Sequence, residues 1–148
     1  MDHPIPEDDA PPGFAPAVHG GPYARALGPF HRKVEHGRLT LGLRLRHHHC
    51  NSSGHAHGGL VASLADLGLI HAVSVLQAHL GRPRTHLTTA SLTVDFTGPA
   101  PEGSWLEIRC EVSKLGRSLG FVEGALHASD KRVGRASAII AVLGPRQD

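Results

Sequence analysis

Asp66 is the residue whose surroundings most clearly suggest chemistry. It is the only formally charged residue between Arg46 and Arg82. In a helix, its neighbours three and four positions away would all be uncharged: Ala62, Ser63, Leu69 and Ile70. A carboxylate in apolar surroundings is costly, and desolvation makes a carboxylate a better base. The pattern predicts a functional carboxylate. The alternatives are a solvated stripe on the helix or a bond to a neighbouring subunit.

Two adjacent glycines, Gly58 and Gly59, end a polar loop that begins near Asn51. In the first turn of a helix the backbone N–H groups lack an internal acceptor, and the helix dipole is positive. Glycine at this point lets a ligand approach the backbone closely. A carbonyl group gains negative charge when it is attacked, and such an N–H can hold that charge. The pattern is compatible with an oxyanion site at Gly58, and equally with an ordinary loop-to-helix turn, which glycines mark in many folds.

A histidine-rich segment beside this loop contains the residue types that bind zinc. They are His47, His48, His49, Cys50, His55 and His57. Adjacent side chains on a strand point to opposite faces, and the spacings to Cys50 and His55 match no known paired-ligand pattern. We therefore expect no metal site, since His-rich polar loops are more often solvated. The same geometry disfavours Cys50 as a nucleophile activated by an adjacent histidine.

A helix is predicted from Gly58 to about Leu80, a stretch without proline that ends at Gly81 and Pro83. Its apolar residues cover most of the helix circumference: Leu60, Val61, Leu64, Leu67, Leu69, Ile70, Val73, Val75 and Leu76. Such a helix is surrounded by protein, so a sheet must wrap around it. The ionisable and amide side chains within the run are costly in hydrocarbon, which argues against a membrane span.

Strands are predicted on both sides of this helix. Strict alternation marks residues 38–46, with 30–35 as a hairpin partner. Four strands follow the helix, around Leu92–Phe96, Leu106–Val112, Leu119–Ala128 and Val133–Leu143. Their short joins predict antiparallel neighbours. The expected fold is α+β, with one long central helix packed across a curved antiparallel sheet. Residues 1–27 are expected to form a partly ordered N-terminal arm, and residues 28–148 a single domain.

The composition indicates which binding partners and which cellular compartment to expect. The net charge of +2 is too small for non-specific nucleic-acid binding. The acidic, proline-containing start is unlike a signal peptide, so a cytoplasmic location is expected. The two cysteines, Cys50 and Cys110, are more simply cytosolic thiols than a disulfide.

Beyond this reading, several residues resemble the signature of the phenylacetate-degradation-type hotdog thioesterases. They are Asn51, Gly54, His57, Gly58, Gly59, Ala62, Leu64 and Asp66. The resemblance extends over residues 92–101 and 112–123, and so over most of the chain from Gly28 onward. It implies a hotdog fold and a coenzyme A thioester substrate. It also implies a homodimer, or a tetramer built from dimers, in which Gly58 of one subunit faces Asp66 of its neighbour.

The resemblance assigns roles by position. Asp66 would be general base or nucleophile, and the Gly58 N–H the oxyanion donor. Asn51 would orient the carboxylate or the attacking water, and His57 would support the loop. A hydroxyl residue on the following strand would place water, and we favour Thr89 over Thr88 and Ser91.

Substrate contacts are expected at three further positions. Gly59 lies beside the oxyanion site, and Lys114 and Arg117 in a tight turn can meet the phosphates of coenzyme A. The alternative for the two basic residues is plain solvation.

Three functional hypotheses follow. The first is an acyl-CoA thioesterase without metal or organic cofactor. The second is a module that binds an acyl-CoA or acyl-carrier thioester without cleaving it. The third, and least favoured, is a hotdog dehydratase or hydratase.

Overall fold

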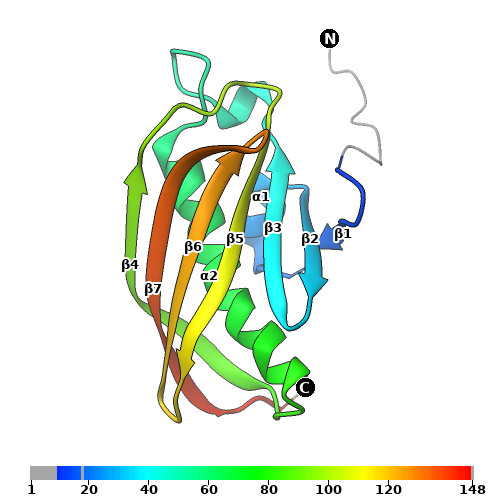
Figure 1. The fold of residues 1–148 in the computed structure, drawn as a ribbon, viewed down its shortest axis with the longest axis vertical. Coiled ribbons are helices and arrows are strands. Elements are labelled where there is room, and N and C mark those ends of the chain that lie inside the picture. Colours follow the sequence, from blue (N-terminus) through cyan, green and yellow to red (C-terminus); the bar gives the residue numbers. More distant parts are fainter. Residues whose placement is uncertain (1–9, 18, 148) are drawn as a thin grey trace.

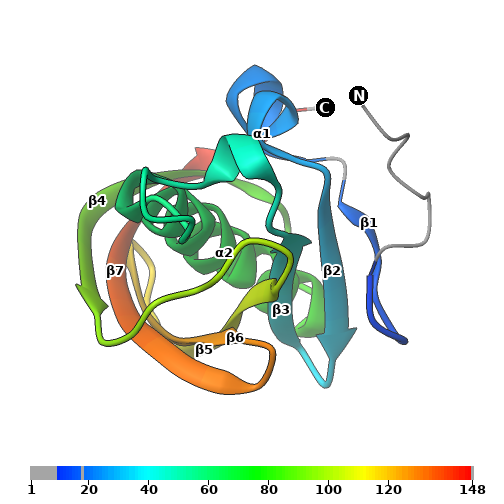
Figure 2. The ribbon, with the colours of Figure 1, turned by 90° about the horizontal axis from the view of Figure 1, so that it is seen from above.

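The computed structural model describes residues 10–17 and 19–147, in which one long helix is enclosed by a curved sheet (Figures 1 and 2). The long helix, α2, spans Gly58–His79, and a short helix, α1, spans Gly21–Leu27. The sheet has seven strands in the order β1-β2-β3-β5-β6-β7-β4, and every neighbouring pair is antiparallel. The strands are β1 Ala15–Ala17, β2 Phe30–Glu35, β3 Arg38–Arg44, β4 Thr85–Phe96, β5 Trp105–Leu115, β6 Leu119–Ala128 and β7 Lys131–Pro145. The α+β layout predicted from the sequence is confirmed.

Helix α2 has the predicted bounds and packs on several faces. Leu64, Leu69 and Val73 are fully buried, as the apolar circumference of the helix requires. They share one core cluster with inward-facing residues of the sheet, among them Leu43, Leu106, Ile108, Leu126 and Ile140. The helix is also long and apolar enough to cross a membrane, a criterion that core helices meet as well. Figure 2 shows the sheet curving around it, which identifies α2 as a core helix.

Gly68 allows α2 to lie close against β5. A Cβ atom at Gly68 would lie 2.5 Å from Ile108 Cγ2 and 3.3 Å from Cys110 Sγ. Burial raises the pKa of the Cys110 thiol to about 12, so this cysteine is a packing residue at neutral pH. Both cysteines are free thiols, as expected.

We expect Gly68→Ala to lower the free energy of unfolding by about 1–3 kcal/mol, because the added methyl overpacks the helix against β5. The better helix propensity of alanine offsets part of this loss, by about 0.5–1 kcal/mol. Urea denaturation at fixed protein concentration measures the change. Gly144→Ala is the control, because a Cβ there meets no atom within 4 Å. Equal midpoints for the two variants would contradict the close approach at Gly68.

Two features of the sheet differ from the sequence predictions. Strand β1 lies within the predicted N-terminal arm and pairs with β2, with Ala15 opposite Arg32. The first nine residues of that arm lie outside the described residues. The expectation that short joins link neighbouring strands is wrong for residues 98–103. Strand β4 pairs with β7, and β5 pairs with β3.

The join after β4 carries the chain from the edge of the sheet to β5, which lies beside β3. It passes over the end of the fold beside the loop that precedes α2 (Figure 1). There the Ala56 N–H donates to the Ala100 carbonyl at 2.8 Å, and the Glu102 N–H donates to the Gly54 carbonyl at 3.0 Å. These bonds fix the loop that carries Gly58, so the crossover helps to hold the N-terminus of α2.

The two edges of the sheet are unlike each other. Strand β1 at one edge has three residues, whereas β4 at the other edge has twelve. On β4 the large apolar side chains of Leu92 and Phe96 are 37% and 56% exposed. A long, exposed, apolar edge strand is a ready template for pairing with another chain. The chain therefore presents unpaired backbone groups and exposed apolar side chains along β4.

Candidate active site

The loop before α2 is held by its own side chains. The Asn51 Oδ1 accepts hydrogen bonds from the N–H groups of Ser53 at 3.0 Å and His55 at 3.2 Å. His57 is the N-cap of α2, and its Nδ1 accepts a hydrogen bond from the Gly59 N–H at 2.9 Å. Histidine at this position thus takes the role of a capping side chain. This hydrogen bond occupies the Gly59 N–H. Gly59 can therefore help substrate binding only through the space that its lack of a side chain leaves open.

The Gly58 N–H remains open. No residue that the structure describes accepts a hydrogen bond from it. It lies in the first turn of a helix of 22 residues, where the dipole favours negative charge. The exposed ring of Phe96 lies beside it, 3.6 Å from the place where a Gly58 Cβ would be. This backbone donor can therefore serve an oxyanion that arrives from outside the chain.

Asp66 lies half-buried at the middle of α2, and Thr89 of β4 contacts it directly. The Thr89 hydroxyl donates a hydrogen bond to the Asp66 Oδ1 at 2.6 Å. Among the described residues Asp66 has no ion-pair partner, so its charge is oriented by a neutral hydroxyl. Its second carboxylate oxygen is free to accept a proton.

One chain does not bring the donor and the carboxylate to the same reacting atom. Gly58 and Asp66 are eight residues apart on α2, which is about 12 Å along the helix axis. A reacting carbonyl has to lie about 3 Å from both the oxyanion donor and the attacking group. No hydrogen bond between described residues joins Asn51 to Asp66 either. Within one chain, the Gly58 N–H and the Asp66 carboxylate are therefore too far apart to contact one carbonyl group directly.

The histidine run has structural contacts. His47–His49 form a short 3-10 helix, and His49 is buried. Its Nδ1 accepts a hydrogen bond from the Arg46 N–H at 2.9 Å, and its Nε2 donates to the Leu27 carbonyl at 2.6 Å. Burial lowers the pKa of His49, which keeps the ring neutral. In the part of the chain that is described, no three His, Cys, Asp or Glu side chains form a metal-binding cluster.

Burial also raises the pKa of the Cys50 thiol, which disfavours the thiolate that a nucleophile needs.

The candidate phosphate contacts, Lys114 and Arg117, lie at the C-terminal end of β5 and in the turn that follows it. Lys114 follows a register shift in the β5–β6 pairing, and Arg117 lies in the turn before β6. Both side chains are exposed and accessible to a ligand.

Two aromatic residues at this site had no signal in the sequence. The Tyr23 hydroxyl on α1 lies 2.7 Å from Ser63 Oγ, which itself donates to the Gly59 carbonyl at 2.8 Å. Tyr23 thus reaches the first turns of α2 from a segment without periodicity. Alternation on β4 places Phe96 on the apolar face, but nothing in the pattern shows that this face is left open beside Gly58.

Comparison with known proteins shows the family to which the chain belongs. The sequence model described as the thioesterase superfamily matches residues 53–135. The Pseudomonas aeruginosa protein PA0474, whose name proposes an esterase, is 37% identical over 132 residues, which cover 88% of this chain and 96% of that protein.

Solved structures show the same fold. The PaaI protein of the phenylacetic acid degradation operon of E. coli has a TM-score of 0.72 at 21% identity, over 83% of this chain and 85% of that one. A Streptococcus pneumoniae thioesterase solved with coenzyme A has a TM-score of 0.65 at 20% identity, over 80% of this chain and 88% of that one. Sequence and fold together place this chain in the thioesterase superfamily, as a thioester hydrolase with the hotdog fold.

Proposed function

We propose that two copies of this chain form an acyl-CoA thioesterase with active sites shared between subunits. Each site combines the Gly58 N–H of one subunit with Asp66 of the other. The observation that carries the proposal is the open Gly58 N–H, about 12 Å along α2 from the Thr89-oriented carboxylate. A two-fold dimer pairs each donor with the opposite carboxylate and forms two identical sites.

The surface along β4 supports this arrangement. Its long edge leaves backbone groups unpaired, and Leu92 and Phe96 remain exposed beside it. Pairing two β4 edges would satisfy the backbone groups and bury both apolar residues. Because Phe96 borders Gly58 and Thr89 contacts Asp66, the same interface would bring both halves of the site together.

The chemistry then follows from the positions of the groups. Asp66 removes a proton from water as the water oxygen attacks the thioester carbon. The carbonyl oxygen becomes an oxyanion and accepts the Gly58 N–H hydrogen bond. The carbon–sulfur bond breaks, coenzyme A leaves as its thiol after taking the proton, and the free acid remains. Direct attack by Asp66 through an anhydride gives the same products after hydrolysis. Thr89 holds the carboxylate in either route.

The remaining site residues hold the loop before α2 in place or contact the substrate. His57 and the Asn51 carbonyl oxygen hold the loop that presents Gly58. The Asn51 amide group is free to orient water or the opposite carboxylate. Lys114 and Arg117 would contact the phosphates of coenzyme A. The S. pneumoniae thioesterase with bound coenzyme A supports this substrate class. We place the enzyme in the cytoplasm, where acyl-CoA thioesters are available to it.

Release of free thiol from short-chain, long-chain and aryl-acyl coenzyme A thioesters tests the proposal. We expect the purified full chain to hydrolyse at least one of them. If one thioester binds tightly and none is cleaved, the protein is a binding module and the catalytic proposal fails.

We expect Thr89→Val to lower kcat about ten-fold, because the carboxylate loses the hydroxyl that orients it while packing is preserved. Thr89→Ser keeps a hydroxyl and is expected to recover most of the lost rate. Thr88→Val is the control, because Thr88 is exposed and makes no hydrogen bond with a described side chain. Equal rates for Thr89→Val and Thr88→Val would show that the contact with Asp66 has no part in catalysis.

A further inference from the structure

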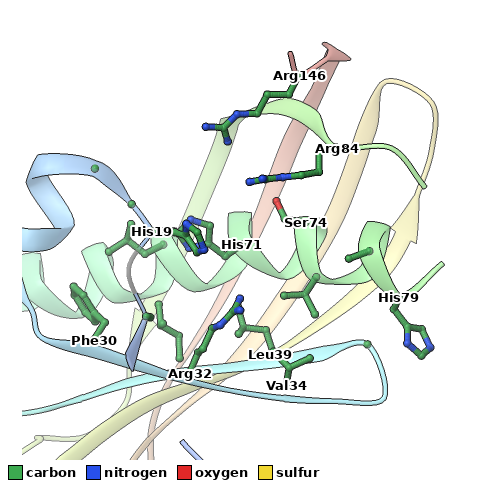
Figure 3. Close-up of a pocket in the computed structure, with 18 residues that line it drawn as sticks. His19, Phe30, Arg32, Val34, Leu39, His71, Ser74, His79, Arg84 and Arg146 are labelled. Atoms are coloured by element: carbon green, nitrogen blue, oxygen red, sulfur yellow. The ribbon is translucent and has the colours of Figure 1, made fainter. Parts of the chain in front are cut away.

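A cavity of about 760 Å³ opens beside α2, between the helix and the β2–β3 hairpin (Figure 3). It begins at Leu67, the residue next to Asp66, and continues along the helix past His71 and Ser74 to His79. Its volume is in the range of small-molecule sites. His71 is five residues beyond Asp66, or about 7.5 Å along the axis. The cavity thus runs beside the part of α2 that follows Asp66, toward the C-terminal end of the helix.

The wall of this cavity is basic. Its ionisable lining residues are His19, Arg32, His71, His79, Arg84 and Arg146, and no Asp or Glu of the described chain lines it. Figure 3 shows Arg32 reaching from β2 toward the helix, with His19 and His71 close together above it. The rings of His19 and His71 are 6.4 Å apart, centre to centre. An anion entering the cavity would meet these basic groups, and none of the acidic side chains that the structure describes lies on its lining.

Arg32 is the key group because the fold itself does not use its charge. Its side chain forms no hydrogen bond or ion pair with any residue that the structure describes. Burial, His19 and Arg32 all lower the pKa of His71, while Asp66 raises it to a smaller extent. A neutral His71 beside Arg32 can donate one hydrogen bond to a carboxylate that the guanidinium also holds.

The floor of the cavity is apolar. It is formed by Phe30, Leu39, Leu41, Leu67 and Val75. A ligand that matches both surfaces has an apolar stem along the floor and an anionic group at the basic wall. Asp66 itself does not line the cavity, but its charge acts on His71, which does.

We propose that this cavity binds the acyl group of the substrate and selects acyl chains with a distal carboxylate, held by Arg32. The assignment of the stem as an acyl chain rests on the proposed thioesterase function. The recognition itself rests on the basic wall and apolar floor. Arginine suits this task because its planar guanidinium binds a carboxylate through two parallel hydrogen bonds.

The test compares coenzyme A thioesters of matched chain length: glutaryl with pentanoyl, adipyl with hexanoyl, and suberyl with octanoyl. We expect wild type to prefer the carboxylated member of at least one pair by about ten-fold in kcat/KM, equivalent to about 1.4 kcal/mol. Arg32→Gln should abolish the preference, and Arg32→Lys should retain part of it. The control is Arg38→Gln on the same hairpin, where Arg38 pairs with Glu111 outside the cavity, and the preference should persist.

Binding of the same thioesters, measured by calorimetry, separates the two proposals. If none is hydrolysed but Arg32→Gln selectively weakens binding of the carboxylated members, the cavity assignment stands and catalysis fails. If thioesters are hydrolysed without any preference for a distal carboxylate, catalysis stands and the cavity assignment is overturned. It is also overturned if Arg32→Gln weakens free coenzyme A as much as the carboxylated thioesters, because Arg32 would then contact the phosphates.

Discussion

Asp66→Asn is expected to lower kcat/KM for every hydrolysed thioester by about 10²–10⁴-fold, the contribution of a positioned general base. The substitution preserves the shape of the side chain, and the carbonyl oxygen of the new amide can still accept the Thr89 hydroxyl. What it removes is the oxygen that takes the proton or attacks the carbonyl. Thiol release under single-turnover conditions measures the loss in the chemical step.

Asp95→Asn is the matched control for this experiment. Asp95 is an exposed carboxylate on β4, and it pairs with Arg135 across the β4–β7 ladder at 2.9 Å. Exposed ion pairs contribute little to stability, so this variant should fold and keep its rate within about two-fold. Equal rates for Asp66→Asn and wild type would show that Asp66 is not the catalytic carboxylate. Loss of rate in both variants would point to a general effect on the β4 surface.

The central helix was predictable because its signal is local. A run that is apolar on all sides predicts a helix within a wrapped core, and the structure confirms the bounds of α2. Asp66 stands out as the one formal charge in that run. The open N–H of Gly58 also follows from its position, since backbone donors at a helix start lack an acceptor within the helix.

Strand pairing was harder to predict because it depends on contacts distant in sequence. The length of the 98–103 join gives no sign that β4 closes the sheet against β7. Thr89 was favoured from the family resemblance, whereas strand alternation alone points to other residues. Strict alternation backward from Leu92 would place Ala90 and Thr88 on the inner face. A register shift between Thr89 and Ser91 turns Thr89 toward Asp66 instead.

Sequence patterns could not predict the basic cavity either. Arg32 lies on β2 and His71 on α2, and each looks like an isolated residue in the sequence. The helix pattern alone predicts a structural role for His71. Only the packing of the hairpin against the helix places these side chains on one wall. The proposed shared site could not be predicted from patterns for the same reason, because it rests on the separation of Gly58 and Asp66 along α2.

Gly58→Pro is expected to lower kcat by about 10²–10³-fold, the cost of removing one oxyanion donor, or about 2.7–4 kcal/mol. Proline lacks the N–H, and the fold makes no use of that group at Gly58. Proline is well tolerated at the first position of a helix. His57 already has φ −61° and ψ 136°, the extended conformation that a residue before proline prefers. The variant should therefore fold, with an unchanged circular dichroism spectrum.

Gly58→Ala separates loss of the donor from loss of space. Alanine keeps the N–H, and its Cβ would lie 3.6 Å from the Phe96 ring, an ordinary van der Waals contact. We expect its kcat to exceed that of Gly58→Pro by about ten-fold or more, since the oxyanion contact is retained. Equal losses in the two variants would show that Gly58 matters for the space it leaves and not for its N–H.

Mixing the two inactive variants tests whether the site is shared. In a dimer of one Asp66→Asn chain and one Gly58→Pro chain, one shared site carries both substitutions and the other carries neither. Each mixed dimer would regain one intact site, so random exchange of subunits should restore about a quarter of the wild-type rate. If Gly58 and Asp66 of the same chain form the site, every site in the mixture carries one substitution and no rate returns. Recovery would therefore require that Gly58 and Asp66 act from different chains, and its absence after demonstrated subunit exchange would rule that arrangement out.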